Sequence, residues 1–425
     1  MADNCIKDNA LMFALDMGTT TLVGKLVDSN GEIRAHAAVF NPQHKYGADI
    51  VRRLEYACSA EGKGHLRDAL MRGISEVLAA VLKEAKVNAA AVRSAVAAGN
   101  AGISVLAVGG NAAALLRPPY RPASCAATCL SLDELDVPLY LFPLVGGYVG
   151  GDLLAVLYGL EEPIPGTLVV DVGTNAEMAL FDGERWLATS VAAGPAFEGG
   201  NISCGMPARA GAVRRVYVEH ERFGVEVISS RHSSAAVVQP QGLCGSGVVE
   251  ALALALEHGL VGVDGTIADP DAVDTNMARY IGFSPTAAGN EQQAFIRVYR
   301  DAQVDLRLTQ DDIRQLQLAK GAIYAGAECL MQRAGLEPNA LQRVCITGAL
   351  GASIRPEILY SIALLPEYMI KKVTFIEDGV IRGLVRFLKS EDAAPALESL
   401  REKIRLYPLS GTPAFERAFV AALNF

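Results

Sequence analysis

Two stretches of the chain have the most regular alternation of apolar and polar positions, and each predicts three consecutive β-strands. In residues 11–40, three apolar runs are separated by a Gly-Thr loop and by the turn SNG. In residues 166–194, three similar runs surround a turn at DGE. Apolar runs of this length, bounded by Gly, Asn and Asp, are typical of strands joined by tight turns. The same opening therefore occurs twice, as expected of a duplicated α/β unit.

Helical periodicity follows each opening. Apolar residues recur at three- and four-residue spacing in residues 65–86, and Ile50, Leu54 and Ala57 share one face of an earlier helix. The remaining expected elements are a short strand at 93–100, a crossing segment at 117–138, helices at 148–160, 245–258 and 309–334, a β-rich insert at 213–238, and a strand-loop-helix at 342–354. We predict two α/β halves, residues 1–147 and 148–400, and a C-terminal segment, 401–425, that packs on the core.

Composition narrows the class of protein. The chain has 425 residues, of which 51% are hydrophobic, which is enough for about two domains. The net charge of −9 and the scattered Lys and Arg residues argue against nucleic acid as a partner. No stretch reaches the ~18 uncharged apolar residues of a membrane span, and the N-terminus does not resemble a signal peptide. We expect a cytoplasmic protein.

The eight cysteines include no C-x-x-C pair and no ferredoxin spacing. Only Cys125 and Cys129 are close in the sequence. Cysteine is among the most buried residue types, so we expect reduced and mostly buried thiols. We expect no iron–sulfur cluster in this chain.

Each opening carries Asp-x-Gly-Thr after its first apolar run, at Asp16 and Asp171, which are 155 residues apart. The glycine allows close approach of a ligand to the backbone, and amides and threonine hydroxyls can bind phosphate oxygens. Mg²⁺ keeps its waters and prefers carboxylate oxygen, so the aspartates could hold it through water. A single copy is better explained by an ordinary hairpin turn. Two copies that face each other could clamp a phosphate chain.

This arrangement resembles the ATPase superfamily of sugar kinases, acetate kinases, heat-shock chaperone ATPases and actin. The resemblance implies two RNase-H-like (actin-like ATPase) halves around a nucleotide cleft, with the β-rich insert in the second half. The cofactors that it implies are ATP and Mg²⁺. The residues that match the two phosphate loops are Asp16, Gly18, Thr19, Thr20 and Thr21 in the first, and Asp171, Gly173, Thr174 and Asn175 in the second.

Three further features are consistent with nucleotide binding. The sequence CITGALG, with Gly348 and Gly351, resembles the adenosine motif, although Ala349 replaces one glycine of the usual pair. Gln317 and Lys320 are one helical turn apart and could flank an adenine, or could lie on a solvated helix face. A glycine-rich helix start could bind an anion or be a plain helix N-terminus; its residues are Gly245, Ser246 and Gly247.

Asp152 is the candidate for the chemical step. It lies 19 residues before Asp171 in a Gly-Asp pair that opens a helix, and sugar kinases of the superfamily carry a similar pair in which the Asp is the catalytic base. In this chain it could orient or deprotonate a water or hydroxyl that attacks the γ-phosphate. The alternative is a simple helix N-cap. Glu198 and Asn201 could face the same cleft or a partner protein, or belong to a tight structural loop.

Longer stretches are more specific, and together they resemble the ATPase part of the reductive activators of corrinoid proteins. They lie at 41–54, 173–180, 192–213, 242–261, 308–326 and 409–425. The resemblance implies that ATP hydrolysis drives the reduction of cob(II)alamin to cob(I)alamin on a methyl-carrier protein. It also implies a homodimer. Family members carry a fused ferredoxin domain, which is not present in this sequence, so we expect a separate ferredoxin-like electron donor.

Two other functions stay open at this point. One is a small-molecule kinase that uses Asp152 as its base. The other is a non-catalytic, ATP-sensing scaffold, which the replacement at Ala349 favours. A related branch, the activators of 2-hydroxyacyl-CoA dehydratases, holds an iron–sulfur cluster between two subunits. Cys125 and Cys129 are the only pair here that could do the same.

Overall fold

The computed structural model describes residues 10–229, 238–285, 292–350 and 354–425. These residues form two compact units, which are described separately. The first unit consists of residues 1–164, 183–188 and 378–408, and the second of residues 165–182, 189–377 and 409–425. The first unit thus extends past the expected boundary at residue 147. It also takes in residues 378–408, which the sequence pattern had assigned to the second half or the C-terminal segment.

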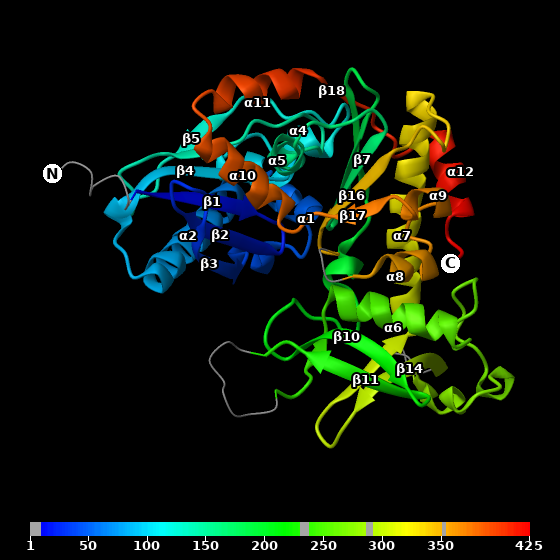
Figure 1. Ribbon diagram of the computed structural model, residues 1–425. Helices are drawn as coiled ribbons and strands as arrows, with labels where there is room; N and C mark the ends of the chain where they lie inside the picture. Colours follow the sequence, from blue (N-terminus) through cyan, green and yellow to red (C-terminus); the bar gives the residue numbers. More distant parts are fainter. Residues whose placement is uncertain (1–9, 230–237, 286–291, 351–353) are drawn as a thin grey trace. The chain divides into compact units, whose positions relative to one another are not determined.

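The first unit is built on a six-stranded sheet in the order β3-β2-β1-β4-β6-β5 (Figure 1). The first three strands are antiparallel, as the repeated turns predict. Strand β4 then lies parallel to β1, and β6 lies parallel to β4. The strands are β1 (Leu11–Met17), β2 (Thr21–Val27), β3 (Ile33–Phe40), β4 (Val92–Gly99), β5 (Thr128–Leu130) and β6 (Leu139–Leu141).

Helices cover the apolar faces of this sheet. Helix α2 packs against β2 and β3, and its residues Leu70, Ile74 and Val77 are fully buried in a core with Phe13 and Leu15. Helices α5 and α10 pack closely on each other. The helices of this unit are α1 (Ile50–Tyr56), α2 (Ala60–Ala85), α3 (Ala101–Ala107), α4 (Ala113–Leu116), α5 (Gly151–Gly159), α10 (Gly379–Lys389) and α11 (Ala393–Glu402).

The second six-stranded sheet has the order β17-β16-β7-β8-β9-β18. Read from β9 to β17, the third, second and first strands of the opening are followed by two strands that lie parallel to the first, as in β3-β2-β1-β4-β6 of the first sheet. This repeat confirms the predicted duplication and the RNase-H-like fold. The strands are β7 (Thr167–Val172), β8 (Asn175–Phe181), β9 (Trp186–Ala192), β16 (Arg343–Gly348), β17 (Val373–Phe375) and β18 (Ile404–Leu406).

Two small sheets extend the second unit. Strands β10 (Ala212–Glu219), β11 (Arg222–Val227) and β12 (Gly242–Leu243) form the first. The second is antiparallel, was not predicted, and is made of β13 (Ile281–Pro285), β14 (Gln292–Arg300) and β15 (Asp305–Thr309). The β-rich insert is therefore larger than expected, and Figure 1 shows β10 below helix α6.

The helices of the second unit are α6 (Gly245–Glu257), α7 (Gln310–Ala334), α8 (Pro356–Ser361), α9 (Glu367–Ile370) and α12 (Pro413–Ala421), with a short 3-10 helix, η4 (Pro195–Glu198), after β9. Helices α6 and α7 agree with the helices predicted at 245–258 and 309–334, whereas α8, α9 and α12 were not predicted. Helix α12 packs along α7. Within the part of the chain that the structure describes, every helix is too short or too polar to cross a lipid bilayer.

Candidate functional site

The first Asp-x-Gly-Thr sequence forms a tight turn between β1 and β2. The Gly18 N–H donates to the Thr21 carbonyl at 3.0 Å. A Cβ at Gly18 would lie 2.6 Å from that carbonyl oxygen, so the turn requires glycine. Asp16 lies near the end of β1, one residue before the last paired residue, and pairs with Val23 of β2.

The carbonyl groups of this turn are held by side chains and backbone of the same unit. The Asn41 side-chain amide donates to the Gly18 carbonyl at 3.0 Å, and its backbone N–H donates to the Thr20 carbonyl at 2.9 Å. The Arg53 guanidinium donates to the Thr19 carbonyl at 2.7 Å. Neither Asn41 nor Arg53 was predicted from the sequence. The signal that could have found Asn41 is its position before Pro42, where Asn caps a 3-10 helix.

Asp152 lies in the first turn of α5, and Gly150 is the N-cap residue of that helix. The alternative role of Asp152 as the N-cap is therefore wrong. Its carboxylate accepts the N–H of Leu153 at 2.9 Å. A Cβ at Gly150 would lie 2.6 Å from the Asn100 Cα, so the start of α5 abuts the end of β4. In this unit, Asn100 thus contacts both the start of the helix that carries the predicted base and the predicted phosphate loop, because it also donates to the Thr19 hydroxyl at 2.8 Å.

The second Asp-x-Gly-Thr sequence joins β7 and β8 in the second unit. The Thr174 hydroxyl donates to the Glu198 carboxylate at 3.1 Å, and the Thr174 carbonyl accepts the Gly194 N–H at 2.8 Å. Gly173 and Thr174 lie between the two strands, whose last paired residues before the loop are Val172 and Ala176. A phosphate at this loop would compete with Glu198 for the threonine hydroxyl.

The predicted adenosine motif begins against this second loop. Gly348 has a φ of +84°, and a Cβ there would lie 2.4 Å from an Asp171 carboxylate oxygen and 2.3 Å from the Val172 carbonyl. Glycine is therefore required by both conformation and space. Ala349 is exposed, so its methyl group does not crowd the core. Gly351 lies outside the described residues.

The glycines at the start of α6 are explained by packing. A Cβ at Gly245 would lie 1.8 Å from the Phe197 carbonyl, and one at Gly247 would lie 2.3 Å from the Val213 carbonyl. The Ser246 hydroxyl donates to the Arg214 carbonyl at 2.8 Å. These contacts seat the helix N-terminus against η4, the element that carries Glu198. The binding of an anion by these three residues stays a prediction.

Gln317 and Lys320 are buried and hold the C-terminal tail. The Gln317 amide donates to the Leu423 carbonyl at 2.9 Å, and the Lys320 ammonium donates to the Asn424 carbonyl. The ammonium also lies 5.4 Å from the centre of the Phe425 ring. Burial lowers the pKa of Lys320 to about 8. The solvated-face alternative is therefore wrong, and the use of both side chains by the tail does not support a place beside an adenine.

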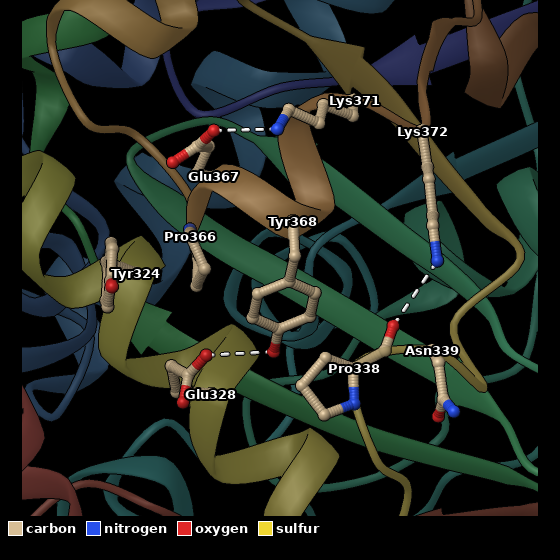
Figure 2. Close-up of a pocket in the computed structure, with 9 residues that line it drawn as sticks. All are labelled: Tyr324, Glu328, Pro338, Asn339, Pro366, Glu367, Tyr368, Lys371 and Lys372. Atoms are coloured by element: carbon tan, nitrogen blue, oxygen red, sulfur yellow. Dashed lines mark hydrogen bonds and ion pairs between the residues drawn. The ribbon is translucent and has the colours of Figure 1, made fainter.

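A separate cavity of about 670 Å³ lies in the second unit, between α7 and the segment that contains α9 (Figure 2). Polar side chains of this cavity form hydrogen bonds and an ion pair. Tyr368 donates to Glu328 at 2.9 Å, Lys371 pairs with Glu367 at 2.7 Å, and Lys372 donates to the Pro338 carbonyl at 3.3 Å. Burial and the neighbouring Glu328 raise the pKa of Tyr368. None of the predicted nucleotide-site residues lines this cavity.

The expectation of mostly buried cysteines is wrong for the described part of the chain. Of its seven free cysteines, Cys58 and Cys129 are exposed and Cys125 and Cys204 are partly exposed. Only Cys244, Cys329 and Cys345 are buried. Among the described residues, no group of three or more His, Cys, Asp or Glu side chains is placed to hold a metal ion directly.

Comparison with known families identifies the chain. Residues 166–425 match the family model described as the C-terminal domain of RACo, the ASKHA domain. Residues 11–161 match the model of the RACo middle region. The chain belongs to the RACo family. The junction between the two matched regions falls at residues 162–165, close to the end of the first segment of unit one at Ile164.

Two curated relatives of this RACo-family chain have names that refer to corrinoids. The corrinoid activation enzyme RamQ of Eubacterium limosum is 30% identical over 433 residues, which cover 97% of this chain and 70% of the relative. The [Co(II) methylated amine-specific corrinoid protein] reductase of Methanosarcina barkeri is 28% identical over 267 residues. That match covers 58% of this chain and 43% of the reductase.

A solved structure confirms the fold. The reductive activator for corrinoid, iron–sulfur protein matches 98% of this chain with a TM-score of 0.85 and 27% sequence identity. This chain spans 66% of that protein and less than half of the Methanosarcina reductase. The actin-like, ASKHA fold that the repeated loops predicted is therefore the fold of this RACo-family chain.

Proposed function

We propose that this chain binds Mg-ATP through its two Asp-x-Gly-Thr loops and hydrolyses it to support the reductive activation of a corrinoid methyl-carrier protein. One observation carries the nucleotide half of this proposal. Asp16 and Asp171 occupy equivalent places, at the ends of the first strands of two sheets that share one strand order. A duplicated loop that keeps its carboxylate, its glycine and its threonine fits phosphate binding with water-bound Mg²⁺.

The donor chemistry of these loops suits the proposed cofactors. Each loop offers one carboxylate, and Mg²⁺ is commonly held by one or two carboxylates while it keeps several waters. Bound Mg²⁺ would neutralise charge on the phosphates. Gly18, Thr19, Thr20 and Thr21 in the first loop, and Gly173, Thr174 and Asn175 in the second, would supply N–H and O–H donors. Asp152, half-buried at the start of α5, would orient the attacking water.

The corrinoid half of the proposal rests on the family and on the names of the relatives. In the reaction that we propose, ATP and water give ADP and phosphate, and one electron passes from a donor to cob(II)alamin to give cob(I)alamin. The electron comes from a separate ferredoxin-like protein, which is the second proposed partner. We also propose that the chain works in the cytoplasm as a homodimer.

Phosphate release tests this function. The wild-type chain is incubated with Mg-ATP, with and without a corrinoid protein whose cobalt is held as Co(II). We expect the corrinoid protein to stimulate release of inorganic phosphate, and EDTA to stop it. Phosphate that appears on an added metabolite would instead show a small-molecule kinase. ATP that binds without turnover under every condition would show a scaffold, and either result would overturn the proposal.

A further inference from the structure

The first phosphate loop presents its backbone in an unusual way, because each of its carbonyl groups is engaged within the first unit. The carbonyls of Gly18 and Thr20 accept from Asn41, that of Thr19 accepts from Arg53, and that of Thr21 accepts from Gly18. Carbonyl oxygens repel phosphate, whereas backbone N–H groups attract it. When all the carbonyl groups of a turn accept hydrogen bonds from the protein, its backbone N–H groups can be offered to an anion.

Two asparagines bind this loop while they cap helices, Asn41 at carbonyl groups and Asn100 at a hydroxyl group. The Asn100 side-chain oxygen accepts the Ile103 N–H at 2.9 Å and so caps α3, while its nitrogen donates to the Thr19 hydroxyl. Asn41 divides its amide in the same way, because its oxygen accepts the Gln43 N–H at 3.0 Å and its nitrogen donates to Gly18. Asparagine is one of the few side chains that can both accept at a helix start and donate elsewhere.

Arg53 completes the arrangement from α1. Its side chain is 1% exposed, and its guanidinium donates to the Gly47 carbonyl at 2.8 Å as well as to Thr19. Burial lowers its pKa to about 10, although the nearby Asp49 acts in the opposite direction. A buried cation with carbonyl partners is costly to desolvate. Its position beneath a predicted phosphate loop gives the charge a function, because it adds positive potential where the anion would bind.

We propose that Asn41, Arg53 and Asn100 are positioning residues that preset the first phosphate loop for the phosphates of ATP. Asn100 also fixes the Thr19 hydroxyl: because its oxygen accepts from the amide, its proton remains available to donate to a phosphate oxygen. Since α5 begins against Asn100, the same residue links the loop to the helix that carries Asp152. This inference rests on the proposed binding of ATP.

Asn100→Ser separates the two roles of the asparagine. Serine is a good N-cap, so α3 keeps its cap, but the shorter side chain loses the donor to Thr19. The matched control is Asn111→Ser, since the exposed Asn111 side chain also accepts a backbone N–H, that of Ala113 at 3.1 Å at the start of α4, and has no described contact with the loop. We expect Asn100→Ser to weaken Mg-ATP binding about fivefold, the size of one lost hydrogen bond, while Asn111→Ser binds like wild type.

Calorimetry of Mg-ATP binding to the intact chain, with thermal unfolding of the same samples, provides the measurement. In a Thr19→Val background, Asn100→Ser should add no further loss of affinity, because the acceptor has been removed. In phosphate release, the variant should raise KM for ATP and leave kcat nearly unchanged. Arg53→Lys, which cannot bridge both carbonyls, should weaken binding in the same way.

The outcomes distinguish this inference from the proposed function. Wild-type protein that binds Mg-ATP, with Asn100→Ser binding equally well, would overturn the positioning role and leave the proposed function standing. Losses that simply add in the Asn100→Ser, Thr19→Val double variant would also overturn it. Wild-type protein that binds no ATP would overturn the proposed function, and with it the inference.

Discussion

Replacement of Asp152 by asparagine is expected to slow ATP hydrolysis by roughly 10²- to 10⁴-fold while ATP affinity changes by less than about threefold. The substitution keeps the size of the side chain, and the amide oxygen can still accept the Leu153 N–H. It removes only the negative charge and the capacity to take a proton from water. Because Asp152 is not the N-cap of α5, the helix should start unchanged.

The control for this variant is Asp68→Asn, which removes one carboxylate from the exposed face of α2 in the same unit. Both variants, and wild type, are compared by phosphate release at saturating Mg-ATP and by calorimetric binding. Asp68→Asn should match wild type in both. If Asp152→Asn releases phosphate at the wild-type rate while ATP still binds, then Asp152 is not the residue that activates water.

Gly383→Ala is expected to destabilise the protein by about 3 kcal/mol, although it adds a single methyl group. Gly383 lies in α10, where a Cβ would be 1.8 Å from the Ala155 carbonyl of α5. The opposing Gly159 leaves no room for adjustment, since its own Cβ position is 2.9 Å from the Gly383 nitrogen. The two helix backbones would have to move apart, and α5 would carry Asp152 with it.

Gly64→Ala is the matched control, because Gly64 lies in helix α2 and a Cβ there would meet nothing within 4 Å. It should be stabilising by about 0.5–1 kcal/mol, since alanine is the better helix former. Urea unfolding followed by circular dichroism gives both free energies of unfolding. A Gly383→Ala protein that unfolds at the wild-type midpoint would contradict the close packing of α5 on α10.

The sequence predicted the parts of the fold that depend on interactions between residues close together in the chain. The two openings were recognisable because apolar runs and tight turns repeat at Asp16 and Asp171, and helices such as α7 have strong periodicity and clear caps. The sequence pattern did not indicate that residues 378–408 belong to the first unit. Their place there depends on a close fit between Gly383 and Gly159, which are more than 200 residues apart in the chain.

In the candidate site, too, features set by nearby residues were predicted and features set by distant residues were not. Residues with a motif of their own, such as Gly18 and Gly348, were found from the sequence, and the structure explains why each must be glycine. The burial of Lys320 was not predicted, because its partner, the Asn424 carbonyl, is a backbone atom about a hundred positions away. Arg53 was missed because an arginine in an amphipathic helix gives no signal that it is buried.

The most direct test of the central claim is the absorption spectrum of a corrinoid protein held as Co(II) under anoxic conditions. The protein is mixed with this chain and a low-potential electron donor, and then with Mg-ATP. We expect Co(I) to form when wild-type chain, donor and Mg-ATP are all present, and Asp152→Asn to abolish its formation. Formation of Co(I) at the same rate without ATP, or its absence from the complete mixture, would contradict a role of this chain in ATP-dependent corrinoid reduction.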